Sequence, residues 1–483
     1  MASNVFTLTP GNNQFTAEDG LLKHFPHHIF REYDIRGMAG SEITPELGYR
    51  LGMAFAATLP TGESRSVVVG RDVRLSGPML QQAVMQGLMD AGIHVLDMGM
   101  GPTPLAYYAV FHLHAAGCIE VTASHNPADH NGFKIMRGRN SLHGHEIQAL
   151  KALMQQPLIK ADKRALISTV DVREAYHRLI VADCPLSRPL KVVIDAGNGP
   201  SGVVAAPIYR SLGCEVIELY CEPDGTFPNH HPDPTVETNM RDLADTVRSH
   251  HADIGIGFDG DGDRIGIVDE QGKMVYGDML LLLLARRLLQ THPGATIISE
   301  AKSSQHLYDG IRIAGGTAVM WRTGHSLIKA KMKETGALLA GEMNGHLFFA
   351  DRFFGFDDAV YAGARIMQML AEAARPLSAM LADLPHSETT PEIRLPFPDD
   401  TKFDLIDAAR THFTALGYRI NSVDGLRIHY GDKENWGWAL LRASNTEPAI
   451  VLRFEATSKQ LLLSIKSEVE TWLCSQANFT GDI

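Results

Sequence analysis

The chain has 483 residues, a length that indicates about three or four domains at ~100–200 residues each. Its 45% hydrophobic and 21% charged residues allow ordinary cores, and its net charge of -12 argues against nucleic acid as the main partner, although a local basic cleft could still bind a phosphorylated substrate. The 5 cysteines show no Cys-x-x-Cys spacing, and no apolar run is long enough for a signal peptide or a membrane-spanning helix, so we expect a cytoplasmic protein.

The N-terminal region leads into a short charged segment. Residues 1 to about 27 are expected to form a loosely structured arm, and the globular part opens with residues 30–37. This segment places Tyr33 and Arg36 next to Gly37. It fits either a charged turn or a turn from which Arg36 reaches an anion, and the spacing alone does not decide between them.

A unit made of a buried strand, a polar loop, an amphipathic helix and a second strand then occurs three times. Its first strands are predicted at residues 66–70, 190–194 and 295–298, its helices at 78–90, 202–212 and 305–314, and its second strands at 92–96, 213–217 and 317–321. Strands that alternate with helices predict parallel or mixed sheets, so the repeats predict three related α/β domains.

The pattern changes after a proline-rich passage at residues 384–400. The predicted order is helix, three alternating strands typical of an antiparallel sheet, and a closing helix capped by a serine. These elements are expected at residues 403–416, 425–430, 436–441, 449–455 and 458–474. The predicted fold class is therefore α/β, with three related mixed-sheet domains and a C-terminal α+β domain. We place the four domains at residues 1–169, 170–273, 274–386 and 387–483.

The first candidate for chemistry is a serine that follows a buried strand at residues 115–121. We expect Ser124 to be exposed on a tight polar turn, with His125 beside it and Lys134 where a loop could return to it. A serine hydroxyl becomes a nucleophile when a base, a cation or a metal acts on it. The alternative is a polar strand-to-helix turn in which Ser124 and Asn126 cap the next helix.

The second candidate is an acidic loop between two apolar runs. Asp259, Asp261 and Asp263 alternate with glycines, so their carboxylates face one way on a curling backbone and would repel each other without a cation. Carboxylate oxygens suit Mg²⁺. The alternative is an EF-hand with Glu270 as its twelfth residue, but the sixth position is Arg264 where that loop requires glycine, and the flanks are strand-like.

Two more polar loops follow. In residues 341–346, two glycines bracket Glu342, Asn344 and His346, which suit hydrogen bonds to sugar hydroxyls, and a charged segment at residues 322–329 precedes them. The loop after residue 441 contains Arg442, Ser444, Asn445 and Thr446, a set that could form an anion-binding turn. Each loop alone could equally be a polar hairpin.

Together, the four loops resemble the α-D-phosphohexomutase superfamily, most closely its phosphomannomutase/phosphoglucomutase branch. The match runs from Tyr33-Asp-Ile-Arg36-Gly37 to the Arg442 loop, covers nearly the whole chain and gives one loop per domain. It implies four domains around a central cleft, and a reversible interconversion of hexose 1-phosphate and hexose 6-phosphate. It further implies a phosphoserine enzyme that needs Mg²⁺, a hexose 1,6-bisphosphate intermediate and the same bisphosphate as activator.

The resemblance also implies a role for each candidate residue. The implied catalytic residues are Ser124, His125, Lys134, Arg36 and His346. The implied Mg²⁺ ligands are Asp259, Asp261, Asp263 and a phosphoserine oxygen of Ser124. The implied substrate-binding residues are Tyr33, Arg264, Lys302, His325, Glu342, Asn344, Arg442, Ser444, Asn445 and Thr446. Asn344 departs from the family, which usually has serine there, and this leaves the sugar preference open.

Three alternatives remain at this point. In a serine phosphatase, water would hydrolyse the phosphoserine, and the anion-binding turn at Arg442, which would hold a second phosphate, would have no purpose. A non-catalytic sugar-phosphate-binding protein would not need Ser124, Lys134 and the three aspartates together. A phosphoglucosamine mutase usually has Ser-Gly-Thr where this chain has Ser444-Asn445-Thr446. The preferred hexose, the pathway served and the oligomeric state stay open.

Overall fold

The computed structural model describes residues 26–60, 65–157, 159–444 and 448–476. The chain divides into two compact units, the first within Met1–Gly277 and Asn344–Ala379, the second within Asp278–Met343 and Met380–Ile483. No helix among the described residues is long and apolar enough to cross a membrane. The division of the chain into four domains, with the bounds given above, remains a prediction.

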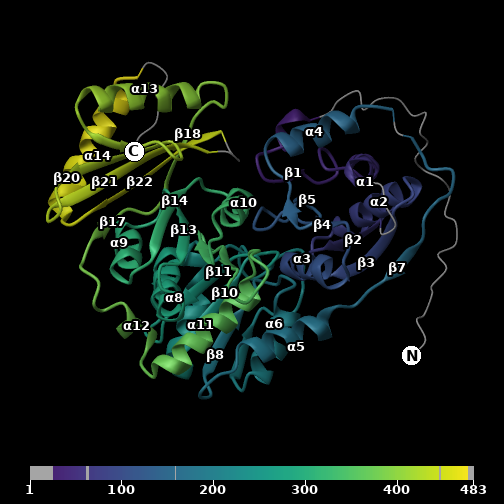
Figure 1. Cartoon of the computed structure of the whole chain (residues 1–483), viewed down its shortest axis with the longest axis horizontal. Helices are drawn as coiled ribbons and strands as arrows, with labels where there is room; N and C mark the ends of the chain where they lie inside the picture. Colours follow the sequence, from purple (N-terminus) through teal and green to yellow (C-terminus); the bar gives the residue numbers. More distant parts are fainter. Residues whose placement is uncertain (1–25, 61–64, 158, 445–447, 477–483) are drawn as a thin grey trace. The chain divides into compact units, whose positions relative to one another are not determined.

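The N-terminal part of the first unit is a seven-stranded mixed sheet (Figure 1). Its strands are β1 (Ile35–Met38), β2 (Ser66–Arg71), β3 (His94–Met100), β4 (Gly117–Val121), β5 (His130–Arg137), β6 (Asn140–Ser141) and β7 (Ile167–Thr169). Its helices are α1 (Pro45–Thr58), α2 (Gly77–Asp90), α3 (Thr103–His112) and α4 (His145–Met154), preceded by the 3₁₀ helix His27–Ile29. Strands β3, β2 and β4 are parallel, and the sheet turns antiparallel at β5.

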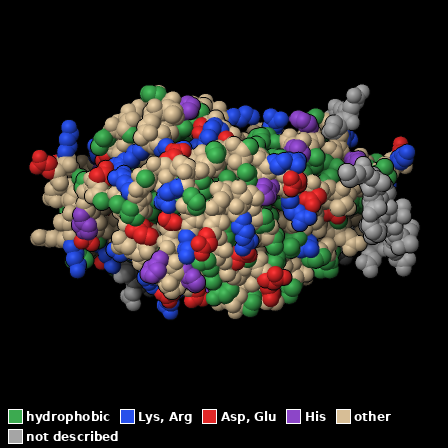
Figure 2. Space-filling model, turned by 90° about the horizontal axis from the view of Figure 1, so that it is seen from below, with side chains coloured by type: hydrophobic (Ala, Val, Ile, Leu, Met, Phe, Trp, Pro, Cys, Tyr) green, Lys and Arg blue, Asp and Glu red, His purple; other side chains and the backbone are tan. Residues whose placement is uncertain are grey.

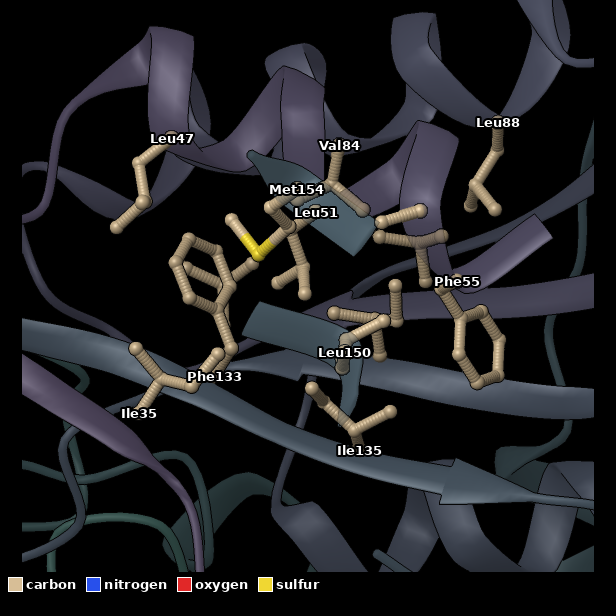
Figure 3. Packing of buried hydrophobic residues seen from close by; sticks show 14 of the residues in the cluster. Ile35, Leu47, Leu51, Phe55, Val84, Leu88, Phe133, Ile135, Leu150 and Met154 are labelled. Atoms are coloured by element: carbon tan, nitrogen blue, oxygen red, sulfur yellow. The ribbon is translucent and has the colours of Figure 1, made fainter. Parts of the chain in front are cut away.

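One face of this sheet packs against α1, α2 and α4 (Figure 3). Leu51 and Val84 point from the helices toward the strands, on the side of the sheet where Phe133 of β5 also lies, and all three side chains are fully buried. A side chain at Gly87 would collide with the backbone of Tyr49, so glycine here lets α1 and α2 approach closely. This packed core supports β4 and β5, the two strands that flank the candidate serine.

The second sheet of this unit has the order β12-β11-β10-β8-β9. Its strands are β8 (Lys191–Asp195), β9 (Glu215–Leu219), β10 (Ile254–Phe258), β11 (Ile265–Val268) and β12 (Met274–Val275). The remaining elements of this part of the chain are α5 (Arg173–Asp183), α6 (Gly202–Ser211), the 3₁₀ helix Glu237–Met240, α7 (Arg241–His250), β16 (Leu347–Phe349), α11 (Ala359–Ala373) and α12 (Leu377–Met380). Here again the sheet is parallel from β9 to β10 and turns antiparallel at β11.

The second unit contains a parallel group of strands and an antiparallel sheet. The parallel group is β14-β13-β15, with β13 (Thr296–Glu300), β14 (Thr317–Trp321), β15 (Leu339–Gly341) and helices α8 (Gly277–Thr291), α9 (Gln305–Ile313) and α10 (His325–Thr335). The antiparallel sheet contains β17 (Glu388–Thr389), β18 (Ile393–Pro396), β19 (Arg419–Asn421), β20 (Leu426–Gly431), β21 (Trp436–Ala443) and β22 (Ala449–Ala456). Helices α13 (Lys402–Ala415) and α14 (Lys459–Cys474) bury one of its faces (Figure 1).

The predicted fold class is confirmed: three mixed α/β domains precede a C-terminal antiparallel domain. The predicted helices agree with α2, α6, α9, α13 and α14 to within one residue at each end. Ser458 caps α14 as predicted, since its side chain accepts the N–H of Leu461. Strands β17 and β18, inside the proline-rich passage, were not predicted.

On the face drawn in Figure 2, the Lys and Arg side chains of the described residues lie among Asp and Glu side chains.

Candidate active site

The candidate serine lies in the connection between β4 and β5. No helix follows it, so the strand-to-helix alternative is wrong: the N–H of Thr122 bonds the carbonyl of Gly132, which makes the segment a strand-to-strand connection. The prediction that Ser124 is exposed is also wrong, because its relative exposure is 0%. The hydroxyl donates to Asp259 Oδ2 at 2.6 Å and lies 3.2 Å from His125 Nδ1. The serine loop is therefore covered by the acidic loop.

The acidic loop joins β10 to β11, so both of its flanks are strands and the EF-hand alternative is excluded. Asp259, Asp261 and Asp263 are fully buried, and their oxygens approach within 4.8 Å of one another. Asp259 Oδ1 accepts the N–H groups of Gly262, Asp263 and Arg264, which curls the backbone around this carboxylate. Burial, reinforced by the charges of Asp261 and Asp263, raises the pKa of Asp259 to about 8.

Lys134 reaches the same cluster from β5. Its Nζ donates to Asp261 Oδ2 at 2.6 Å and to Asp263. Burial alone would lower the pKa of Lys134, but the two carboxylates outweigh it and raise the pKa, so the ammonium stays charged. Burial likewise opposes ionisation of Asp261, yet Lys134 and a hydrogen bond from Thr103 lower the pKa of Asp261. One buried cation thus offsets part of the charge of three carboxylates.

The acidic cluster could hold a metal ion. Its donors are carboxylate oxygens, the type that hard divalent cations prefer. Asp261 Oδ1 is buried and makes no hydrogen bond to any described residue. A buried acceptor of this kind is costly unless it has a partner, and a cation would provide one. The residues present therefore fit a divalent cation.

His346 lies beside the cluster with two partners. Arg264 Nε donates to His346 Nε2 at 2.9 Å, and His346 Nδ1 lies 3.0 Å from Asp357 Oδ2. This arrangement is that of a neutral ring with its proton on Nδ1. Burial would lower the pKa of His346, but the charges of Asp263 and Asp357 outweigh it and raise the pKa. A proton can reach Nε2 only when Arg264 no longer donates to it, because the single lone pair of Nε2 accepts the Arg264 N–H.

Two further predicted residues line the serine loop. Arg36 donates from Nε to Asp34 Oδ2 at 2.7 Å and from Nη1 to Asn126 Oδ1 at 3.1 Å. Burial, followed by the charges of Arg264, Arg36 and Lys134, lowers the pKa of His125 well below its usual value. His125 is thus neutral next to the serine hydroxyl. The guanidinium of Arg36 contacts Asn126 and so brings a positive charge to the serine loop.

The second unit brings together another set of predicted residues. Lys302 Nζ donates to Glu392 Oε2 at 2.9 Å and lies 3.5 Å from Glu300 Oε2. These carboxylates outweigh the effect of burial and raise the pKa of Lys302. The Arg442 guanidinium pairs with Asp424 through Nε at 2.7 Å. Both cations are therefore held by acidic side chains of their own unit.

The remaining predicted residues that the structure describes belong to one unit or the other. The buried Glu342 accepts the N–H of Gly324 at 2.6 Å, just before the buried His325 opens α10. The carbonyl of the buried Ser444 accepts Lys402 Nζ at 2.5 Å. Tyr33 and Asn344 are half-buried. Asn445 and Thr446 lie outside the described residues.

Several residues that hold these groups were missed by the sequence reasoning. In the first unit they are Asp72, Arg74, Thr103, Thr122 and Asp357, and in the second they are Glu300, Glu392 and Asp424. The sequence signal for three of them was their place at the end of a strand. Asp72 and Arg74 follow β2, and Glu300 is the last residue of β13. Loops that follow strands often carry functional residues in α/β domains.

Comparison with known proteins agrees with this architecture. The phosphoglucomutase/phosphomannomutase alpha/beta/alpha domains I, II and III match residues 27–157, 174–272 and 276–387, and the C-terminal domain of that family matches residues 392–471. The resemblance seen in the sequence is therefore confirmed. The chain belongs to the phosphoglucomutase/phosphomannomutase family, within the α-D-phosphohexomutase superfamily.

Individual relatives share most of their length with the chain. A phosphomannomutase/phosphoglucomutase of Pseudomonas putida is 46% identical over 450 residues, covering 93% of this chain and 96% of the relative. A phosphoglucomutase of Neisseria meningitidis is 43% identical over 461 residues, covering 95% and 99%. The crystal structure of a phosphoglucomutase/phosphomannomutase family protein from Burkholderia thailandensis has a TM-score of 0.86 at 43% identity and covers 92% of this chain and 97% of its own.

Proposed function

We propose that the chain reversibly interconverts hexose 1-phosphate and hexose 6-phosphate, with glucose or mannose as the hexose, through a phosphoserine at Ser124 and a hexose 1,6-bisphosphate. The observation that carries this proposal is the Ser124 hydroxyl, hydrogen-bonded to a buried cluster of three carboxylates and one ammonium. Relatives with 43% to 46% identity over more than nine-tenths of the chain, all named as such mutases, support it.

Mg²⁺ is the cation proposed for the acidic cluster. Asp259, Asp261 and Asp263 would hold it together with an oxygen of phosphorylated Ser124. Bound there, the ion supplies positive charge against the charge of the transferring phosphoryl group. A hexose 1,6-bisphosphate would serve as activator by reloading an unphosphorylated Ser124.

The chain's own residues account for the proton movements. The phosphoryl group leaves Ser124 Oγ as the free hydroxyl oxygen of the hexose phosphate bonds to phosphorus, and His346 Nε2 takes the hydroxyl proton in exchange for the hydrogen bond from Arg264. Lys134 and Arg36 offset negative charge around the serine, while neutral His125 accepts or donates a single hydrogen bond. In the second half-reaction the bisphosphate returns its other phosphate to Ser124, and His346 gives the proton back to the oxygen that is released.

Substrate recognition is assigned to a second set of residues. These are Tyr33, Arg264, Lys302, His325, Glu342, Asn344, Arg442 and Ser444, together with Asn445 and Thr446. The planar guanidinium of Arg442 can bind a phosphate with two parallel hydrogen bonds. The carboxylate of Glu342 can accept hydrogen bonds from sugar hydroxyls. We also infer the four-domain division given above and a cytoplasmic location.

A coupled assay tests the function directly. Mannose 1-phosphate and glucose 1-phosphate, each with a trace of the matching 1,6-bisphosphate, should yield the 6-phosphate without net release of inorganic phosphate. Stoichiometric phosphate release would instead favour the phosphatase alternative. Preferential use of glucosamine 1-phosphate would favour the phosphoglucosamine mutase alternative.

The sugar preference gives a sharper expectation. When the bisphosphate turns end for end, only hydroxyls near the turning axis can meet the same partners, and on a pyranose these are O3 and O4. Glucose and mannose share both, so we expect their kcat/KM values to agree within about tenfold, or about 1.4 kcal/mol. Galactose, inverted at O4, would leave a polar group unpaired at a cost of ~1–3 kcal/mol.

This prediction is tested by measuring kcat/KM for the three hexose 1-phosphates with the wild type and with Asn344→Ser. We expect the substitution to change the ratio between glucose and mannose, since asparagine is longer than serine and has both a donor and an acceptor. Efficient galactose turnover would show that O4 is not recognised. An unchanged profile in Asn344→Ser would remove Asn344 from the sugar site.

Arg442→Lys should weaken binding of the phosphate that does not react. A lysine ammonium cannot make the paired, planar contact of a guanidinium. Losing one charge-assisted hydrogen bond costs ~1.5–3 kcal/mol, which predicts a KM roughly 10- to 150-fold higher. Arg410→Lys, on the exposed side of α13, is the matched control and should leave KM unchanged. A wild-type KM in Arg442→Lys would place the clamp elsewhere.

A further inference from the structure

Arg74 is fully buried beneath the serine loop, and each of its donor groups is used. Nη2 donates to the carbonyls of Ser124 at 2.8 Å and Asn126 at 2.6 Å. Nη1 donates to the carbonyls of Pro127 at 2.5 Å and His130 at 2.9 Å. Nε pairs with Asp72 Oδ2 at 3.1 Å. A guanidinium has five N–H groups, so all of them are engaged by the protein.

The same network also reaches the other side of Ser124. Asp72 Oδ2 accepts the hydroxyl of Thr122 at 2.8 Å, and the Thr122 oxygen accepts the N–H of Ser124 at 2.9 Å. Asp72 Oδ1 accepts the N–H of Arg74, which fixes the aspartate itself. The N–H and the carbonyl of Ser124 are therefore both held by one closed ring of buried hydrogen bonds.

This ring holds a backbone conformation that serine rarely adopts. Ser124 has a φ of 51°, in the left-handed region that favours glycine. The direction of the Ser124 hydroxyl depends on that backbone, because it decides where the Cβ points. With both peptide groups of Ser124 fixed, the hydroxyl is directed at Asp259.

We propose that Arg74, Asp72 and Thr122 are positioning residues for phosphoryl transfer, which hold Ser124 in its left-handed conformation so that its oxygen meets the acidic cluster. This inference rests on the proposed function. Arg74 has no donor left for a phosphate, so its effect on the reaction passes through the serine backbone. Lysine has three donors where this site uses five, and Arg74→Lys therefore leaves buried carbonyls without partners.

The first test compares two buried arginines of the same unit. Arg50 is also buried, but it contacts Glu46 and the carbonyl of Met154, away from the serine loop. We expect Arg74→Lys to lower kcat on the order of 10²-fold with KM within about twofold, as a small displacement of reacting groups does. Arg50→Lys should keep the wild-type kcat per folded molecule. Equal losses in both variants, or a wild-type kcat in folded Arg74→Lys, would overturn the proposal.

A second pair of variants decides the matter if Arg74→Lys does not fold. Thr122→Val removes only the hydroxyl that holds the Ser124 N–H, and Thr122→Ser keeps it. We expect kcat per folded molecule to fall roughly five- to tenfold in the valine variant and to recover in the serine variant, with both assayed well below their melting temperatures. A valine variant as active as the wild type would refute the positioning role.

Wild-type protein assayed in parallel separates the two possible failures. A wild type that carries no phosphate on Ser124 and does not interconvert hexose phosphates would refute the proposed function. A phosphorylated and active wild type beside equally active Arg74→Lys and Thr122→Val proteins would refute this inference alone.

Discussion

Ser124→Ala is expected to abolish mutase turnover and to remove the phosphate that we propose for the resting enzyme. The hydroxyl is the only group of this residue that can accept the phosphoryl group, so the loss should span several orders of magnitude in kcat, as for other nucleophiles. The fold should persist, because the Arg74 network holds the backbone of residue 124 and not its side chain.

Intact mass before and after phosphatase treatment, followed by peptide mapping, checks this expectation. Ser141→Ala, at another buried serine of the same sheet, is the control and should keep both phosphate and activity. A phosphate mapped to a different residue, or appreciable turnover in Ser124→Ala, would show that the nucleophile lies elsewhere. Retained binding of a hexose phosphate by Ser124→Ala would confirm that the variant lacks only the chemistry.

Removal of divalent cations is expected to have an effect of similar size. Exhaustive chelation should stop turnover, and added Mg²⁺ should restore it. Asp261→Asn should raise the Mg²⁺ concentration needed for half-maximal activity. Loss of an outer partner of a metal ligand already costs ~10–100-fold in affinity, and loss of a ligand carboxylate should cost at least as much.

The matched control is Asp245→Asn, which removes an exposed carboxylate on α7 that pairs with Arg248. It should leave the Mg²⁺ requirement unchanged. Full turnover after chelation would contradict a metal-dependent mechanism. An Asp261→Asn protein with the wild-type Mg²⁺ requirement would remove Asp261 from the proposed ligand set.

Local patterns made much of the fold predictable. Alternating strands and amphipathic helices gave the repeat, and the spacing of Asp259, Asp261 and Asp263 gave a cluster of carboxylates between two strands. These features depend on residues close together in the chain, where periodicity and repulsion act directly. The same is true of the Ser458 cap of α14.

The supporting contacts could not be predicted in this way. Arg74 bonds backbone carbonyls about fifty residues away, and a carbonyl carries no side-chain signature that a sequence could display. The burial of Ser124 depends on a loop more than a hundred residues later in the chain. Asp357 meets His346 because an isolated antiparallel bridge pairs Asp357 with Phe348, a contact that no side-chain pattern announces. Long-range packing of this kind appears only in the folded chain.

Each of the two sheets of the first unit changes from parallel to antiparallel at one strand pair, and a loop of the candidate site lies at each change. In the first sheet the serine loop joins β4 to β5 at this change, and in the second sheet the acidic loop joins β10 to β11 at the corresponding change. The two loops therefore occupy equivalent positions, each at the edge where a parallel sheet gains its first antiparallel strand. One loop carries the proposed nucleophile and the other the three carboxylates, so two turns of the same geometry, from two different sheets, meet at Ser124 and Asp259.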